Sequence, residues 1–90
     1  MTARFEGRVQ GVGFRFTTLH LAAGLDIRGF VRNEEDGSVT VVAEGQEDQL
    51  LALVHRVKMS NLGRYIVNAA ICWSMPTGEF RDFSIQTDGW

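Results

Sequence analysis

Two glycines and an arginine have the residue types and spacing of a phosphate-binding loop. Gly11 and Gly13 follow a segment with strand-like alternation, and Arg15 stands where a helical pattern begins. Glycine has no side chain to keep backbone N–H groups away from an anion. Several N–H groups at a helix start can form a concave anion site, and the arginine fork matches phosphate oxygens. We therefore predict a phosphate site formed by Gly11, Val12, Gly13, Phe14 and Arg15.

A plainer interpretation treats this segment as a tight turn, with Arg15 as a solvated surface charge, because a glycine-rich loop alone is a weak signal. A second segment, residues 29–39, favours the functional interpretation, since it brings Asn33 to the end of a predicted strand. The asparagine amide can accept one hydrogen bond from a water molecule and donate another. Asparagine also flanks turns for purely structural reasons.

The apolar patterns predict the elements that must position these residues. Strands are predicted at residues 3–9, 27–33, 38–44, 66–74 and 83–86, and helices between residues 14 and 25 and at 47–59. An Asp-Gly pair between the second and third strands indicates a hairpin. The element order predicts an α+β fold, the ferredoxin-like split βαβ sandwich. We expect an antiparallel sheet of four strands plus a short fifth edge strand, with two helices on one face.

This topology predicts where the two motifs lie relative to each other. Right-handed crossovers place the third strand between the first and the second. The first two strands then run in the same direction, about 10 Å apart, and end at the same edge of the sheet. The loop after the first strand and Asn33 at the end of the second are therefore expected to meet at one site.

The composition is that of an ordinary globular chain, and we expect one domain over residues 1–90. The net charge is −2 and the basic residues are scattered, which argues against a nucleic-acid partner. The chain shows no leader segment and no apolar run long enough to cross a membrane. The single cysteine excludes an internal disulfide framework and multi-cysteine zinc sites. We expect a soluble monomer in the cytoplasm, with no membrane partner.

Other reactive side chains are interpreted as structural. Cys72 lies in a predicted strand beside apolar residues, which indicates a buried and inert thiol. His20 and His55 are interpreted as surface or packing residues, because neither has a carboxylate or nucleophile at a meaningful spacing. Residues 34–36 are adjacent acids in a predicted hairpin, which are expected to be solvated rather than to bind a metal. Gln10 is compatible with a role in shaping the loop, but no chemical role is assigned to it.

Taken together, the two motifs resemble those of the acylphosphatase family. Residues 7–15, GRVQGVGFR, resemble the family's phosphate-loop signature, and residues 29–39, GFVRNEEDGSV, resemble its second signature. Their order and separation also agree, as do Gly45 and the C-terminal segment 78–85. The resemblance covers essentially the whole chain. It departs mainly at residues 59–72, where a Gly-Pro pair before the fourth strand is missing, so the start of that strand stays open.

The resemblance implies an activity and two residue roles. It implies hydrolysis of the carboxyl–phosphate bond of small acyl phosphates to a carboxylate and inorganic phosphate, without a metal or other cofactor. Arg15 matches the family's phosphate-binding arginine, and Asn33 matches its water-positioning asparagine. An acyl phosphate needs little general-acid help, because its carboxylate leaving group has a low pKa.

Three other functions are compatible with parts of the chain. A non-catalytic anion-binding module of the same fold would keep the loop but lack turnover. An RNA-binding sheet would display aromatic residues on its central strands, and residues 38–44 contain none. A copper-binding domain would need paired cysteines, and the chain has only Cys72.

Overall fold

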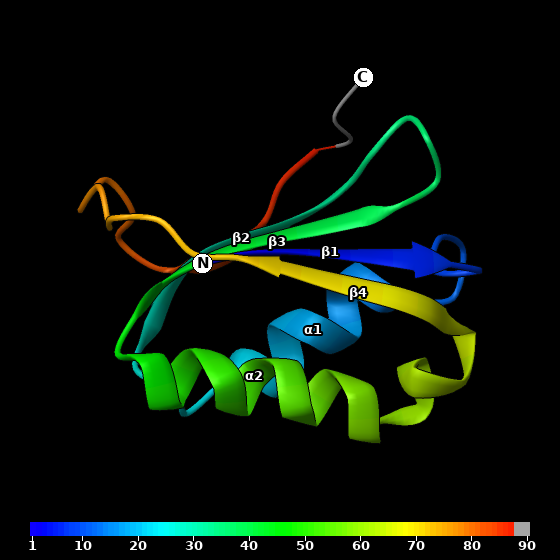
Figure 1. The fold of residues 1–90 in the computed structure, drawn as a ribbon, viewed down its shortest axis with the longest axis horizontal. Coiled ribbons are helices and arrows are strands. Elements are labelled where there is room, and N and C mark those ends of the chain that lie inside the picture. Colours follow the sequence, from blue (N-terminus) through cyan, green and yellow to red (C-terminus); the bar gives the residue numbers. More distant parts are fainter. Residues whose placement is uncertain (88–90) are drawn as a thin grey trace.

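The computed structural model describes residues 1–87 and contains one five-stranded sheet in the order β4-β1-β3-β2-β5. Two helices cover one face of this sheet (Figure 1). In chain order the elements are β1 (Thr2–Gly7), α1 (Phe14–Ala22), β2 (Ile27–Asn33), β3 (Val39–Gly45), α2 (Glu47–Met59), the 3-10 helix η1 (Asn61–Tyr65), β4 (Ile66–Cys72) and β5 (Phe83–Ile85).

The predicted split βαβ arrangement is confirmed for the first four strands. β3 lies between β1 and β2 and is antiparallel to both, so β1 and β2 run in the same direction. β4 pairs with the other side of β1, also in antiparallel orientation. The carboxyl ends of β1 and β2 therefore lie at the same end of the sheet, which is the relationship that the predicted site needs.

The expectation of a purely antiparallel sheet is wrong at β5, which pairs in parallel with β2. The reason lies in residues 73–82, which connect β4 to β5. The Glu44 carboxylate at the end of β3 accepts hydrogen bonds from the backbone N–H groups of Thr77 and Gly78, at 2.6 and 3.0 Å. This contact holds the connection at the end of the sheet where β4 finishes and β2 begins. β5 therefore starts beside the beginning of β2 and runs the same way.

The core lies between the sheet and the helices. Buried residues alternate along the central strands, as in Ala3 and Phe5 of β1, and follow helical spacing along α2. The bounds predicted for β2 and α2 agree with the structure. The helical face of α2 consists of Leu50, Leu53, Val54 and Val57.

Several strand boundaries differ from the prediction by one or two residues. β4, predicted at residues 66–74, ends at Cys72, because Cys72 pairs with Thr2, where the partner strand β1 begins. β1 ends at Gly7 instead of Val9, because the backbone N–H of Arg8 bonds to the Tyr65 carbonyl at 3.0 Å and the pairing with β4 shifts. Gly7 adopts a φ of 130°, and a Cβ there would lie 2.2 Å from the Tyr65 carbonyl oxygen. β4 begins at Ile66, directly after η1.

The prediction that Cys72 is buried is wrong. Cys72 is exposed, because it ends β4, an edge strand on which every second residue faces away from the helices. It pairs with Thr2 at the start of β1. Within residues 1–87, none of the helices has the length and apolar character needed to cross a membrane.

Candidate active site

The residues of the two sequence motifs meet at the carboxyl ends of β1 and β2. Arg15 and Asn33 line the same cavity, which has a volume of about 340 Å³. Its lining consists of Val9, Gly11, Gly13, Phe14, Arg15, Phe16, Asn33 and Ile85. Of the predicted loop residues, only Val12 does not line the cavity, because its side chain packs against the hydrophobic core.

The loop before α1 depends on glycine for its backbone conformation. Gly11 and Gly13 have φ values of 79° and 76°, in the left-handed region that other residues rarely adopt. A Cβ at either position would meet nothing within 4 Å, so conformation and not space requires glycine. The Phe14 side chain is buried, and its ring centroid lies 5.3 Å from that of Phe5 in β1. This contact fixes the start of α1 against the sheet.

The start of α1 has the electrostatics of an anion site. The first N–H groups of a helix have no acceptor within the helix and carry partial positive charge. The first turn of α2 contains Glu47 and Asp48, which complement that charge, whereas the first turn of α1 contains no acid and includes Arg15. Gly13, the N-cap of α1, offers no side-chain cap. A guanidinium at the positive end of a helix favours a bound anion.

Gln10 connects the loop to the hairpin that follows Asn33, a contact that the sequence interpretation, which gave Gln10 only a role in shaping the loop, did not identify. Its Nε2 donates hydrogen bonds to the backbone carbonyl oxygens of Glu34 and Ser38, at 2.7 and 3.0 Å. The Ser38 carbonyl also accepts the Glu34 N–H at 2.9 Å, so the same contact closes the hairpin. The only available signal was a long amide side chain in a loop expected to end near a hairpin.

Two of the acidic residues that follow Asn33 form an ion pair or hydrogen bonds with neighbouring side chains. The Glu34 carboxylate pairs with the Arg32 guanidinium at 3.0 Å and accepts the Thr40 hydroxyl at 2.7 Å. The hydrogen bond from Arg32, followed by that from Thr40, lowers the pKa of Glu34 below its usual value. The side-chain and backbone hydrogen bonds from Ser38 likewise lower the pKa of Asp36. The negative charge closest in sequence to Asn33 is thus compensated by an arginine.

The side chains interpreted as structural lie outside this cavity. His20, His55 and Cys72 are exposed, and none of them is among its lining residues. Over the described part of the chain, no group of three or more His, Cys, Asp or Glu residues is arranged to hold a metal ion.

Comparisons with known proteins agree over almost the whole chain. The model of the acylphosphatase family matches residues 1–85. A relative named acylphosphatase from Salinibacter ruber is 41% identical over 86 residues, covering 96% of this chain and 90% of its own. One from Paenarthrobacter aurescens is 44% identical over 85 residues, covering 94% of this chain and 90% of its own.

Solved structures show the same fold alone and within a larger protein. An acylphosphatase from Bacillus subtilis superposes with a TM-score of 0.82 at 32% identity, and the match covers 94% of each chain. Full-length HypF, in a phosphate- and nucleotide-bound form, superposes with a TM-score of 0.78 at 28% identity. That match covers 98% of this chain and 12% of HypF.

Proposed function

The chain belongs to the acylphosphatase family, hydrolases that act on acid anhydrides, and we propose that it cleaves acyl phosphates in the cavity shared by Arg15 and Asn33. The substrates are small acyl phosphates, and the products are a carboxylate and inorganic phosphate. The observation that carries this proposal is the single cavity lined by residues of both sequence motifs.

The loop binds the phosphoryl group through its backbone and through Arg15. The N–H groups of residues 11–15 and the guanidinium donate hydrogen bonds to the equatorial oxygens, where charge is spread in the in-line transition state. The left-handed glycines hold these N–H groups in place before the substrate binds. A preorganised donor of this kind contributes about 3 kcal/mol to transition-state stabilisation, by analogy with oxyanion holes.

Asn33 orients the attacking water molecule. Its amide oxygen accepts a hydrogen bond from the water, and its amide nitrogen can donate one to a neighbouring oxygen. An amide is not a base, so the proton of the water passes to a phosphoryl oxygen of the substrate. The new oxygen–phosphorus bond forms as the acyl oxygen–phosphorus bond breaks, and the carboxylate leaves with the electron pair. No step requires a metal, since the guanidinium and the backbone N–H groups carry the charge stabilisation.

We also propose that residues 1–90 form one domain that acts as a monomer in the cytoplasm. The continuous sheet from β1 to β5 supports a single folding unit. The net charge of −2 supports a small anionic substrate bound locally over a nucleic-acid partner. Sedimentation velocity tests the monomer, because a dimer would sediment at a distinctly higher coefficient.

Phosphate release tests the proposed function. The purified protein is incubated with acetyl phosphate and, separately, with p-nitrophenyl phosphate, each with and without EDTA. We expect phosphate release from acetyl phosphate alone, unaffected by EDTA, because only the acyl phosphate has a carboxylate leaving group. Equal turnover of the two substrates, or loss of turnover in EDTA, contradicts the proposed mechanism. Phosphate binding without any turnover would favour a non-catalytic anion-binding module.

A further inference from the structure

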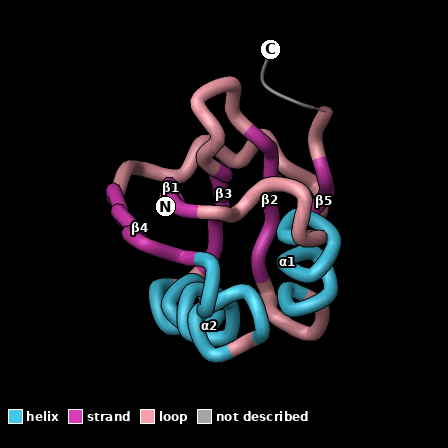
Figure 2. The backbone as a smooth tube through the Cα atoms, turned by 90° about the vertical axis from the view of Figure 1, so that its right-hand side faces the viewer, coloured by secondary structure: helices cyan, strands magenta, loops and turns pink. Residues whose placement is uncertain are grey.

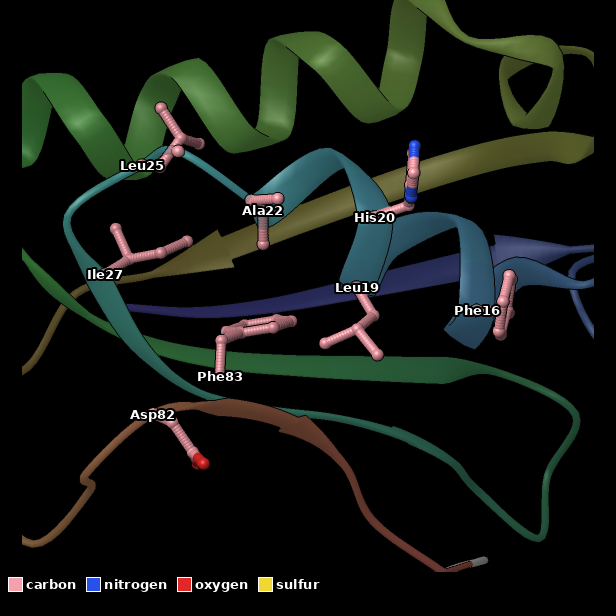
Figure 3. A pocket seen from close by; sticks show the side chains of 10 residues that line it. Phe16, Leu19, His20, Ala22, Leu25, Ile27, Asp82 and Phe83 are labelled. Atoms are coloured by element: carbon pink, nitrogen blue, oxygen red, sulfur yellow. The ribbon is translucent and has the colours of Figure 1, made fainter.

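A second hollow of about 490 Å³ lies beside the phosphate cavity, between α1 and β5. Figure 3 shows the side chains around it. We call it the α1 groove and define it by its apolar residues Phe16, Leu19, Ala22, Leu25, Ile27 and Phe83. Phe16 lines both the groove and the phosphate cavity, so the two hollows meet at this residue.

The groove runs away from the phosphate cavity along α1. α1 begins at the glycine loop and has nine residues, which corresponds to a length of about 13 Å. On the opposite side, β5 is parallel to β2 and pairs Ile85 with Val31, close to Asn33. Phe83 lies further from the cavity on the same strand, and α1 and β5 lie side by side (Figure 2).

Large apolar side chains are exposed to solvent where the groove meets the phosphate cavity. Phe16 is 71% exposed and Ile85 is 39% exposed, although both are large apolar residues beside a charged site. Leu19 points toward Phe83 across the groove (Figure 3), and it is not part of the buried core cluster. An apolar group placed along these side chains would remove their surface from water.

The far end of the groove is lined by apolar side chains. Asp82 lies directly before β5, and its side chain points away from α1 and from the groove (Figure 3). Leu25 and Ile27 line the same end and offer only apolar contacts. The groove therefore suits a neutral apolar chain whose one anionic end lies at Arg15.

We propose that the α1 groove binds the acyl group of the substrate and selects acyl phosphates with an apolar chain of up to about ten carbons. The estimate follows from a carbon–carbon bond of about 1.5 Å, which advances an extended chain by roughly 1.3 Å per carbon. The proposal rests on the proposed function, because it requires the phosphoryl group to lie at Arg15. Continuity of the groove with that cavity identifies the occupant, since the acyl group is the part of the substrate that must leave the phosphate site.

Steady-state kinetics with acetyl, butyryl, hexanoyl and octanoyl phosphate test this proposal. We expect KM to fall about twofold for each added methylene, with little change in kcat, because half-exposed methylenes gain roughly half of the full burial energy. In Leu19→Gln, the ratio of kcat/KM for octanoyl to acetyl phosphate should fall about tenfold. This ratio is independent of how much of the variant is folded. The matched control is Leu51→Gln, a 45%-exposed leucine on α2 outside the groove, which should keep the wild-type ratio.

The outcomes separate the groove from the proposed function. If acetyl phosphate is hydrolysed but KM is the same for all four acyl phosphates, the acyl-binding role of the α1 groove is overturned and the proposed function stands. Calorimetric titration with methylphosphonate and n-octylphosphonate makes the same comparison without turnover. Tighter binding of the octyl compound together with no hydrolysis of any acyl phosphate overturns the proposed function and supports the groove. If Leu19→Gln changes the sedimentation coefficient but leaves the kinetic constants unchanged, the groove binds a second copy of the chain. This result overturns the proposal.

Discussion

The side-chain nitrogen of Gln10 lies 2.7 Å from the backbone carbonyl oxygen of Glu34. This hydrogen bond joins the loop before α1 to the residue that follows Asn33. The segments that carry the proposed phosphate-binding and water-orienting groups are thus linked by a residue that does not line the cavity. We propose that Gln10 is a positioning residue in this arrangement.

Substituting Gln10 by alanine should lower kcat about tenfold, because the loop and the hairpin lose two hydrogen bonds that hold them in register. If Gln10 acts by positioning Asn33, Asn33→Ala should cost less in the Gln10→Ala background than in the wild type. The matched control is Gln49→Ala, which removes a glutamine contact with the backbone N–H of Asp26, outside the cavity. If the effects of Gln10→Ala and Asn33→Ala on kcat are fully additive, the positioning role is contradicted.

Arg15→Ala should lower kcat/KM for acetyl phosphate by about 100- to 1,000-fold, corresponding to the loss of a preorganised charged donor. The circular dichroism spectrum should stay that of the wild type. The control is Arg28→Ala, because Arg28 lies near the start of β2, at the opposite end of that strand from Asn33. Turnover by Arg15→Ala within threefold of the wild type would exclude the proposed role.

Asn33→Ala should lower kcat by about 100-fold and leave KM nearly unchanged, because the side chain is proposed to bind the water and not the substrate. Asn33→Asp should be worse, since a carboxylate there would repel the phosphoryl oxygens. Asn68→Ala, on the exposed side of β4, is the control for loss of an asparagine. An increase in KM with an unchanged kcat is the result that would contradict this role.

Gly13→Ala should destabilise the fold by about 1–2 kcal/mol and reduce activity further than the loss of folded protein explains. Its φ of 76° is unfavourable for alanine, and relaxation would turn N–H groups away from the cavity. Gly78 has a φ of 73°, and a Cβ there would also meet nothing within 4 Å. Gly78→Ala should therefore carry a similar stability cost with normal activity per folded molecule, as measured by urea titration and kinetics. Equal specific activity of the two variants would refute a role for the loop conformation.

The stability of the fold should depend on pH through Glu34. Folding lowers the pKa of this carboxyl, so the unfolded chain binds a proton more readily in acid. The stabilising contribution is present above the usual pKa of 4.5 and is lost as the pH falls below it, through the pKa of the folded state. The urea midpoint of the wild type should therefore exceed that of Glu34→Gln at pH 6, and the difference should shrink by pH 3. The matched control for loss of a carboxylate is Glu35→Gln, at the exposed neighbouring position.

Local sequence patterns correctly predicted those elements whose formation depends on residues close together in the sequence. The Asp-Gly turn identified the hairpin that separates β2 from β3, and the apolar stripe identified α2 with its observed bounds. Topology rules brought the loop and Asn33 together, and the shared cavity agrees with that expectation. The chemical roles of Arg15 and Asn33 stay predictions.

What was missed depends on contacts between residues that are distant in the sequence. The direction of β5 follows from the binding of Thr77 and Gly78 to Glu44, which no pattern within residues 73–86 reveals. The position of Gln10 depends on carbonyl groups, and every residue has one, so its partners leave no sequence signature. Cys72 is exposed because β4 lies at an edge with alternate residues turned from the core, whereas its apolar neighbours indicated burial.

The exposed thiol of Cys72 has a practical consequence. It belongs to the only cysteine of the chain and pairs across to the first residue of β1, whereas the cavity follows the last residue of that strand. A maleimide linker would thus attach at a single point, on the opposite side of the molecule from the phosphate loop. The native sequence is suited to oriented immobilisation on a sensor chip, with every attached molecule presenting its cavity to the flowing solution.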